Sequence, residues 1–283
     1  MTALLAYLFY FVASTGSTLQ RRWLAVNKNV SNEGQLQLAF QSFAFTAVLG
    51  LFIPFFVPFN LAGDPLKLVL LSLTAGVAGA GFFWASYTAQ KHVEAGVTTV
   101  LGIMNTPVAI ILSIAFLGEG LPTMQLIGTG FLLVGAVVVS QKHRIGRFTF
   151  DRYFWMMCAA GVMLGITITA ERALQLETGF TAGTLFSWWA QLIALGIATY
   201  VSRSRHSYSL QDVTITGVMR FLQSLSWVIL IFTVGNLSLV ASITTFKVVL
   251  VFAAAALFLN ERDDLGRKII GSLIAVAGLL LMR

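Results

Sequence analysis

Apolar runs of about 20 residues recur along the whole chain, and no other feature constrains its fold so strongly. A run of that length crosses the hydrocarbon core of a bilayer as one helix. Charged residues make up only 10% of the chain, against about 25% in a typical soluble domain, and the mean hydropathy is +0.85. A soluble core cannot bury so many runs, so the sequence predicts an all-α integral membrane protein.

Polar residues, glycines and prolines divide the apolar runs into ten predicted transmembrane helices. Three short breaks carry turn signals, at residues 63–65, 118–122 and 235–236. The predicted helices cover approximately residues 2–21, 36–57, 66–88, 96–117, 122–140, 152–172, 180–201, 213–234, 238–259 and 265–282. Helices joined by such short turns are antiparallel neighbours.

A basic connection at the middle of the chain separates two similar halves. Residues 116–119, followed by Gly128, are similar to residues 258–261, followed by Gly271, if one residue is inserted in the second turn. The preceding helices then align at an offset of 142, which sets Asn105 opposite Lys247.

The halves are predicted to be residues 1–141 and 152–283, joined by a basic cytoplasmic linker at 142–151. Because each half holds five helices, an odd number, the two halves enter the membrane from opposite sides. The sequence thus predicts an inverted-topology repeat, an architecture common in transporters, with the site at the midplane between the halves.

Lysine and arginine are distributed unevenly over the predicted connections. Thirteen follow odd-numbered helices, and three lie in the even-numbered connections or the carboxyl-terminal tail. Basic residues favour the cytoplasmic side, so the odd-numbered connections are predicted to be cytoplasmic and both termini outside a cell (inner) membrane. The net charge of +7 therefore reports orientation in the bilayer, and no nucleic-acid partner is expected.

Several motifs resemble a known family. The stretch from Glu94 to Val108, which contains Pro107, and residues 116–119 with Gly128 are similar to the end of an EamA domain of the drug/metabolite transporter superfamily. The second half departs from the pattern, with Val249 in place of the proline and Asn260 in place of the glycine. The resemblance implies a ten-helix secondary carrier of amino acids, nucleosides, sugars or other metabolites, with a cavity that opens to each side in turn.

Two cations lie inside predicted helices, where charge is expensive and a functional role is the first hypothesis. Lys247 lies about 13 Å along its helix, near the bilayer centre. We expect it to bind substrate or a counter-ion, or alternatively to form an internal ion pair. Arg220 lies about 10 Å from the cytoplasmic end of its helix, so either a cavity position or an interfacial one is compatible with the sequence.

Polar and aromatic residues share helix faces that are expected to point inward. Arg220, Gln223, Ser224 and Trp227 follow helical spacing, as do Thr184, Ser187, Trp188 and Gln191. Trp84 and Tyr87 form a third such group, for which a lipid-headgroup aromatic belt is the alternative. The predicted substrate-binding residues are Lys247, Arg220, Gln223, Trp227, Trp188, Gln191, Asn105, Trp84 and Tyr87.

Pro107 follows Asn105 and Thr106 inside a predicted helix. Proline removes a backbone donor and weakens the helix locally, so the position is a candidate hinge for a gate or, alternatively, a structural kink.

Carboxylates and histidines map to segment ends or connections. Glu171 and Arg172 are expected to close their helix as an interfacial pair. With only cations at depth, an anionic or zwitterionic substrate moved by facilitated diffusion or exchange fits better than a proton-driven cationic drug.

The sequence thus predicts a secondary transporter, an exporter or exchanger of a small metabolite such as an amino acid. The alternative is a non-transport membrane protein, such as a lipid scramblase or an assembly scaffold. No catalytic, metal or cofactor motif stands out, so an enzyme is not expected. The expected partners are a small-molecule substrate and the bilayer, and both a monomer and a homodimer are compatible with the sequence.

Overall fold

The structure, a computed structural model, describes residues 2–27, 32–92, 102–140, 152–202, 208–258 and 265–282. Helices and short turns make up these ranges, and none of them contains a strand. The basic linker at 142–151, the stretch from Glu94 to Val97 and the second-half motif at Asn260 and Glu261 lie outside the described residues.

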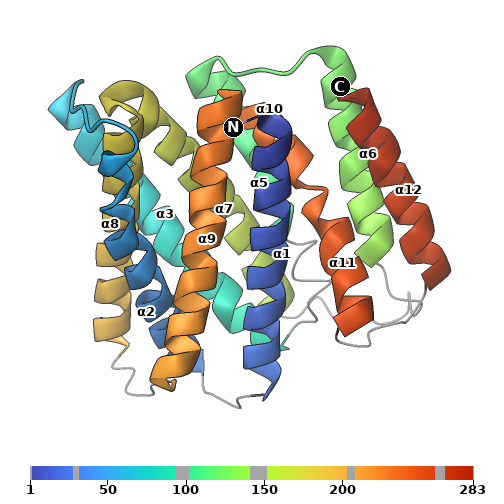
Figure 1. Cartoon of the computed structure of the whole chain (residues 1–283), viewed down its shortest axis with the longest axis horizontal. Coiled ribbons are helices and arrows are strands. Elements are labelled where there is room, and N and C mark those ends of the chain that lie inside the picture. The colour runs from blue at the N-terminus through green and yellow to red at the C-terminus, as the bar shows by residue number, and fades with distance from the viewer. Residues whose placement is uncertain are drawn as a thin grey trace.

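The helices pack together in a single bundle (Figure 1). Their bounds are α1 Ala3–Asn27, α2 Asn32–Gly50, η1 Ile53–Phe55, α3 Pro65–His92, α5 Asn105–Leu112, η2 Ser113–Leu117, α6 Thr123–Ser140, α7 Arg152–Thr178, α8 Phe180–Val201, α9 Leu210–Val234, α10 Leu237–Thr244, α11 Lys247–Phe258 and α12 Leu265–Leu281.

Six helical stretches within the described ranges are long and apolar enough to cross a membrane. They are Gly34–Phe55, Pro65–Ala89, Arg152–Thr178, Phe180–Val201, Leu210–Val234 and Leu237–Ala254. Shorter apolar helices cover Asn105–Leu117, Thr123–Val138 and Ile269–Leu281. The chain is therefore a helical, multi-pass membrane protein, while the count of ten helices and the inverted repeat stay predictions.

The helices that surround the centre come from both predicted halves. α3 packs against α7 and α8, and α9 packs against α1 and α2. α6 and α12 form a pair at one edge of the bundle (Figure 1). Glycines let this pair approach closely: a Cβ on Gly128 would lie 2.7 Å from the carbonyl oxygen of Gly278, and one on Gly135 would lie 2.6 Å from that of Gly271.

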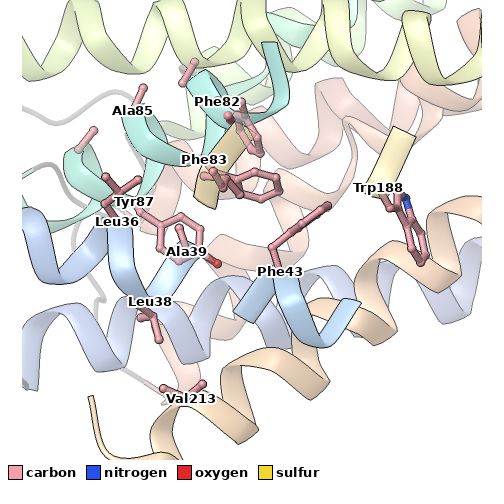
Figure 2. Close-up of a cluster of buried hydrophobic side chains, with 14 of the residues drawn as sticks. Leu36, Leu38, Ala39, Phe43, Phe82, Phe83, Ala85, Tyr87, Trp188 and Val213 are labelled. Carbon is pink, nitrogen blue, oxygen red and sulfur yellow. The ribbon is translucent and has the colours of Figure 1, made fainter. Parts of the chain in front are cut away.

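An aromatic cluster lies where α2 and α3 meet. Figure 2 shows Phe43 of α2 beside Phe83 of α3, with Tyr87 further along α3. The ring centroids of Phe43 and Phe83 are 4.8 Å apart, a separation typical of favourable aromatic pairs. The Tyr87 ring meets Phe83 edge-on at 6.2 Å. These rings form a rigid wall on one side of the bundle centre.

Two helices continue past the ends that the sequence predicts. α1 runs to Asn27 instead of residue 21, and α7 runs to Thr178 instead of residue 172. The predicted boundaries are wrong at these positions because they stop at the first charged residues. Arg21 and Glu171 consequently lie within helices, and both are buried.

Two other helices are interrupted at positions that correspond under the 142-residue offset. A turn at Ile103 and Met104 precedes α5, and a turn at Thr245 and Phe246 separates α10 from α11. The segment predicted at 238–259 therefore forms one apolar stretch long enough to cross a membrane, Leu237–Ala254, but a turn that the sequence does not predict divides it. Pro107 lies in the first turn of α5, after the interruption, where its missing N–H breaks no helical hydrogen bond.

The two interruptions contact each other. The hydroxyls of Thr106 and Thr245 are 2.8 Å apart, and the Thr106 hydroxyl also lies 3.3 Å from the carbonyl oxygen of Ala241. The break in one helix is therefore held by hydrogen bonds against the break in the other.

The turns at Gly118 and Gly235 meet in a group of five residues that we call the turn cluster: Glu119, Arg172, Gly235, Leu237 and Ser238. Both glycines cap their helices with positive φ, 68° and 71°. Arg172 donates from Nε to Glu119 at 2.8 Å and from Nη2 to the Gly235 carbonyl at 2.7 Å.

The turn cluster is completed from the start of α10. The Leu237 amide donates to the second Glu119 carboxylate oxygen at 2.6 Å, and the Ser238 hydroxyl donates to the Glu119 carbonyl. The turn between α5 and α6 lies at the same end of the bundle as both chain termini (Figure 1). The cluster therefore ties α7, α10 and this turn together at that end.

Candidate functional site

A central cavity of about 140 Å³ lies between the helices of the two predicted halves. It has room for about ten water molecules. This volume is comparable to that of a small metabolite. α1, α2, α3, α7, α8, α9 and α11 all contribute to its wall, together with Asn105 of α5 and Gly102 before it. The lining residues are Tyr10, Thr18, Arg21, Phe43, Phe82, Phe83, Ser86, Gly102, Asn105, Met157, Leu164, Thr167, Ile168, Glu171, Trp188, Gln191, Arg220, Gln223, Ser224, Trp227 and Lys247.

The charges that line the cavity are unbalanced. Arg21, Arg220 and Lys247 face it, and Glu171 is the one carboxylate among the lining residues of the described chain. Of the ion pairs found among the described residues, Lys67 with Glu177 and Arg172 with Glu119, neither involves a cavity residue. The cavity therefore has an excess of positive charge in a medium where unpaired charge is costly.

Arg220 lies against the aromatic wall. Its guanidinium carbon is 4.4 Å from the centre of the Phe83 ring and 5.9 Å from that of Phe43, within the range of cation–π attraction. Its Nη1 donates a long hydrogen bond of 3.4 Å to Gln223, while its buried Nε finds no acceptor among the described residues. Of the two positions that the sequence leaves open, the structure gives Arg220 the one in the cavity.

Lys247 is the first residue of α11, directly after the helix interruption. Its ammonium donates a long hydrogen bond of 3.4 Å to the Tyr10 hydroxyl and lies 6.0 Å from the centre of that ring. The Tyr10 ring in turn packs against Trp227, with 5.8 Å between the ring centroids. A single long contact leaves most of the donor capacity of the ammonium unused.

Glu171 lies in the cavity wall and does not pair with Arg172, so the predicted interfacial pair is wrong. Its side chain is only 5% exposed, and the Ser187 hydroxyl donates to Oε2 at 2.8 Å. Gln191 donates to the same hydroxyl at 2.9 Å. The expectation that no carboxylate lies deep in the bundle is therefore also wrong. The sequence argument against proton coupling depended on that expectation and no longer holds.

Arg21 also lines the cavity, although the sequence assigns it to a cytoplasmic connection. Its Nε donates to the Ser17 carbonyl at 3.2 Å, and its guanidinium carbon lies 5.3 Å from the centre of the Tyr87 ring. The helical spacing of Ser14, Ser17, Thr18 and Arg21 was a usable signal for a polar, inward-pointing face.

The structure brings most of the predicted site residues together. The cavity is lined by Lys247, Arg220, Gln223, Trp227, Trp188, Gln191 and Asn105. Trp84 is 51% exposed on the outer surface of α3, and Tyr87 is buried within the aromatic wall without reaching the cavity, so neither lines the cavity. Pro107 is half-buried two residues after Asn105 and does not line it either.

The described part of the chain contains no group of three or more histidine, cysteine, aspartate or glutamate side chains that could hold a metal. Cys158 is a free thiol on α7. What the cavity offers is therefore charge, amides, hydroxyls and aromatic surface, a combination that suits reversible binding of a small polar molecule.

Comparisons with known proteins agree with the fold. Residues 1–141 match the model of the EamA-like transporter family, whose members are generally transporters and not enzymes. No curated protein matches the chain. One solved structure, described only as the crystal structure of a protein, is similar at a TM-score of 0.72 and 15% identity. The match covers 99% of this chain and 95% of that one, and at this identity it shows the fold alone.

Proposed function

Because the chain belongs to the EamA-like transporter family of the drug/metabolite transporter superfamily, we propose that it carries a small anionic or zwitterionic metabolite through alternating access around the central cavity. The carrying observation is the excess of cations in the cavity wall, where Arg21, Arg220 and Lys247 face Glu171, the one carboxylate among the described lining residues. An acidic group on the substrate supplies the negative charge that balances these cations.

The energetic argument rests on the position of Arg220 and Lys247 inside the helical bundle, where both side chains are half-buried. A cation taken out of water without a partner is destabilising by several kcal/mol, roughly, and such residues inside a membrane are kept where they serve a function. Arg220 and Lys247 each have one long hydrogen bond to a side chain, and the Nε of Arg220 has no acceptor among the described residues. A bound carboxylate or phosphate offers several acceptor lone pairs at the point where these donors converge.

The two helix interruptions support alternating access. Breaks within helices often mark hinges, and transporters of the inverted-repeat type use broken helices at the midplane. Asn105 and Lys247 each follow an interruption directly, each lines the cavity, and the two are related by the 142-residue offset. We therefore propose that the chain is an inverted repeat of five-helix halves in which these breaks act as paired hinges, with Pro107 in the first turn after one of them.

In the proposed transport cycle, the turn cluster holds the helices together at one end of the bundle and so closes the cavity on that side. It ties α10 and the turn after η2 to Arg172 on α7, one residue from Glu171 in the cavity wall. Under the orientation expected from the basic residues, this end faces away from the cytoplasm of a cell (inner) membrane. A reporter fused to the carboxyl end that scored as cytoplasmic would overturn this orientation.

The proposal is tested with purified protein in two steps. A thermal-shift screen against metabolites identifies a ligand, since any molecule that binds the native state raises its apparent stability. Counterflow of that ligand, radiolabelled, is then measured in proteoliposomes. We expect Lys247→Ala to lower its uptake at least tenfold, and Lys67→Ala, at an exposed position, to leave it unchanged.

Two outcomes would redirect the assignment. Uptake that is unaffected by Lys247→Ala would remove that lysine from the site. Proteoliposomes that move no acidic metabolite but exchange fluorescent lipid between leaflets would favour the scramblase alternative over a metabolite carrier.

A further inference from the structure

Glu171 stands out among the cavity residues because its carboxylate is only half satisfied. The residue is 5% exposed, and Oε2 accepts the Ser187 hydroxyl at 2.8 Å. The other oxygen, Oε1, is buried and accepts no hydrogen bond of standard geometry among the described residues, although the Trp188 side chain lies close to the carboxylate. A buried acceptor without a partner is unfavourable, and it persists in folded proteins where something else satisfies it.

The Glu171 carboxylate is held in place from α8 and α3. Gln191 donates to the Ser187 hydroxyl at 2.9 Å, which leaves the hydroxyl hydrogen free to point at Glu171. Gly79 of α3 makes room for Gln191, since a Cβ at that glycine would lie 2.5 Å from the Gln191 Cγ. Three helices thus fix the direction of the carboxylate, which is a property of a preorganised site.

The unmet oxygen of Glu171 shares the cavity with the unmet Nε of Arg220. Glu171 and Arg220 line the same space and attract each other electrostatically, but they are too far apart to form an ion pair. One wall therefore offers a free acceptor and another a free donor. A zwitterionic ligand suits both atoms with matching charge, because its ammonium can donate to Oε1 of Glu171 while its carboxylate accepts from Nε of Arg220.

We propose that Glu171 forms a second subsite, which binds the ammonium group of a zwitterionic substrate whose carboxylate meets Lys247 and Arg220. This inference rests on the proposed function, because it names the substrate class of the same cavity. It makes Glu171 the residue that separates an amino acid from the corresponding acid without an amino group. Phe43, Phe83 and Trp188 supply an apolar surface for the rest of the ligand.

The experiment compares ligands that differ by one charged group. Leucine and phenylalanine are titrated into the full-length protein in lipid nanodiscs, each beside its desamino acid (4-methylpentanoate or 3-phenylpropanoate) and its decarboxylated amine. We expect at least one of the two amino acids to bind about tenfold or more tightly than either analogue. Glu171→Gln is expected to reduce the preference over the desamino acid to less than threefold, roughly.

Two further variants make the result decisive. Glu177→Gln changes a carboxylate on the same helix that pairs with Lys67 at the protein surface, so the preference for the amino acid should be retained. Ser187→Ala removes the hydroxyl that orients Glu171, and a weakened preference is expected even where Glu171→Gln does not fold.

Three outcomes would overturn the subsite. Equal binding of an amino acid and its desamino acid by the unchanged protein rejects Glu171 as an ammonium site and leaves the acid-binding function intact. An amino-acid preference that survives Glu171→Gln, with only the pH dependence lost, would make Glu171 a proton site instead. Binding of neither the amino acids nor the acids would reject both this inference and the proposed class of substrate.

Discussion

Two groups of largely enclosed charge in this protein, the turn cluster and the cavity, differ in how many hydrogen bonds and ion pairs they form. In the turn cluster, Arg172 and Glu119 are 11% and 12% exposed and face each other at 2.7 Å. Both Glu119 carboxylate oxygens accept a hydrogen bond, and Arg172 also binds the Gly235 carbonyl. In the cavity, Arg220 and Lys247 have only long hydrogen bonds to side chains, and Oε1 of Glu171 and Nε of Arg220 have none among the described residues.

The difference separates structural charge from functional charge. A buried ion pair whose hydrogen-bond donors and acceptors are all matched holds parts of the fold together. Loss of one partner leaves the other charge unpaired in a low-dielectric environment. A buried charge without a partner makes the opposite contribution: it destabilises the empty protein and is available to a ligand. Charge removal should therefore affect stability with opposite signs at the two places.

The largest expected effect comes from breaking the turn cluster. Arg172→Met leaves the Glu119 carboxylate buried without its cation, for which we expect a loss of about 3 kcal/mol in unfolding free energy. The change is measured as the shift of the unfolding midpoint in a denaturant titration of the purified protein.

A double-mutant cycle checks the cause of that loss. Glu119→Gln combined with Arg172→Met should cost much less than the sum of the single changes, because the pair is then removed as a unit. Additive losses would mean that Arg172 acts through its contact with Gly235 and not through Glu119.

Removal of a cavity cation is expected to act in the opposite direction. Lys247→Met takes away a charge that has no carboxylate partner in the described part of the chain, so we expect unfolding free energy to be unchanged or to rise by about 1 kcal/mol. Uptake of the identified ligand should fall at least tenfold in the same variant. Lys247→Arg keeps the charge and serves as the control.

A loss of several kcal/mol in Lys247→Met would contradict the comparison. It would show that Lys247 is held in an internal ion pair, the alternative that the sequence leaves open.

A smaller effect is expected at the contact between the helix breaks. Thr106→Val removes the 2.8 Å hydrogen bond to Thr245 and should lower unfolding free energy by about 1 kcal/mol. Thr233→Val is a matched control, because that exposed hydroxyl only bonds back to its own helix. A decrease in transport rate beyond that of the control would connect this contact to the hinge.

The sequence predicted much of the fold because hydrophobic runs and glycine turns are local signals. The turns at Gly118 and Gly235 were found from glycine itself, and Lys247 and Arg220 were found because a charge deep inside an apolar run is conspicuous. Glu171 and Arg21 were missed for the reverse reason: each stands near the end of an apolar run, so the run was ended there.

Whether a charge ends a helix depends on what its side chain meets, and hydropathy does not contain that information. Glu171 stays within α7 because Ser187 of the neighbouring helix receives it. Trp84 shows the same limit in another form, since its large ring gives no sign of whether it faces lipid or cavity, and the structure turns it outward. Contacts between helices decided these positions, and only the structure supplies them.

The smallest expected effect comes from a third ion pair, which tests whether burial is what gives the turn cluster its strength. Lys67 and Glu177 lie 3.4 Å apart, but their side chains are 60% and 27% exposed. Water competes for both charges there, so Lys67→Met should change unfolding free energy by no more than about 0.5 kcal/mol. The same denaturant titration measures this change. Added salt should shift the unfolding midpoints of this variant and of the unchanged protein by the same amount. If Lys67→Met proved as damaging as Arg172→Met, burial would not explain the strength of the turn cluster, because an exposed pair with one contact would then match a buried pair with several.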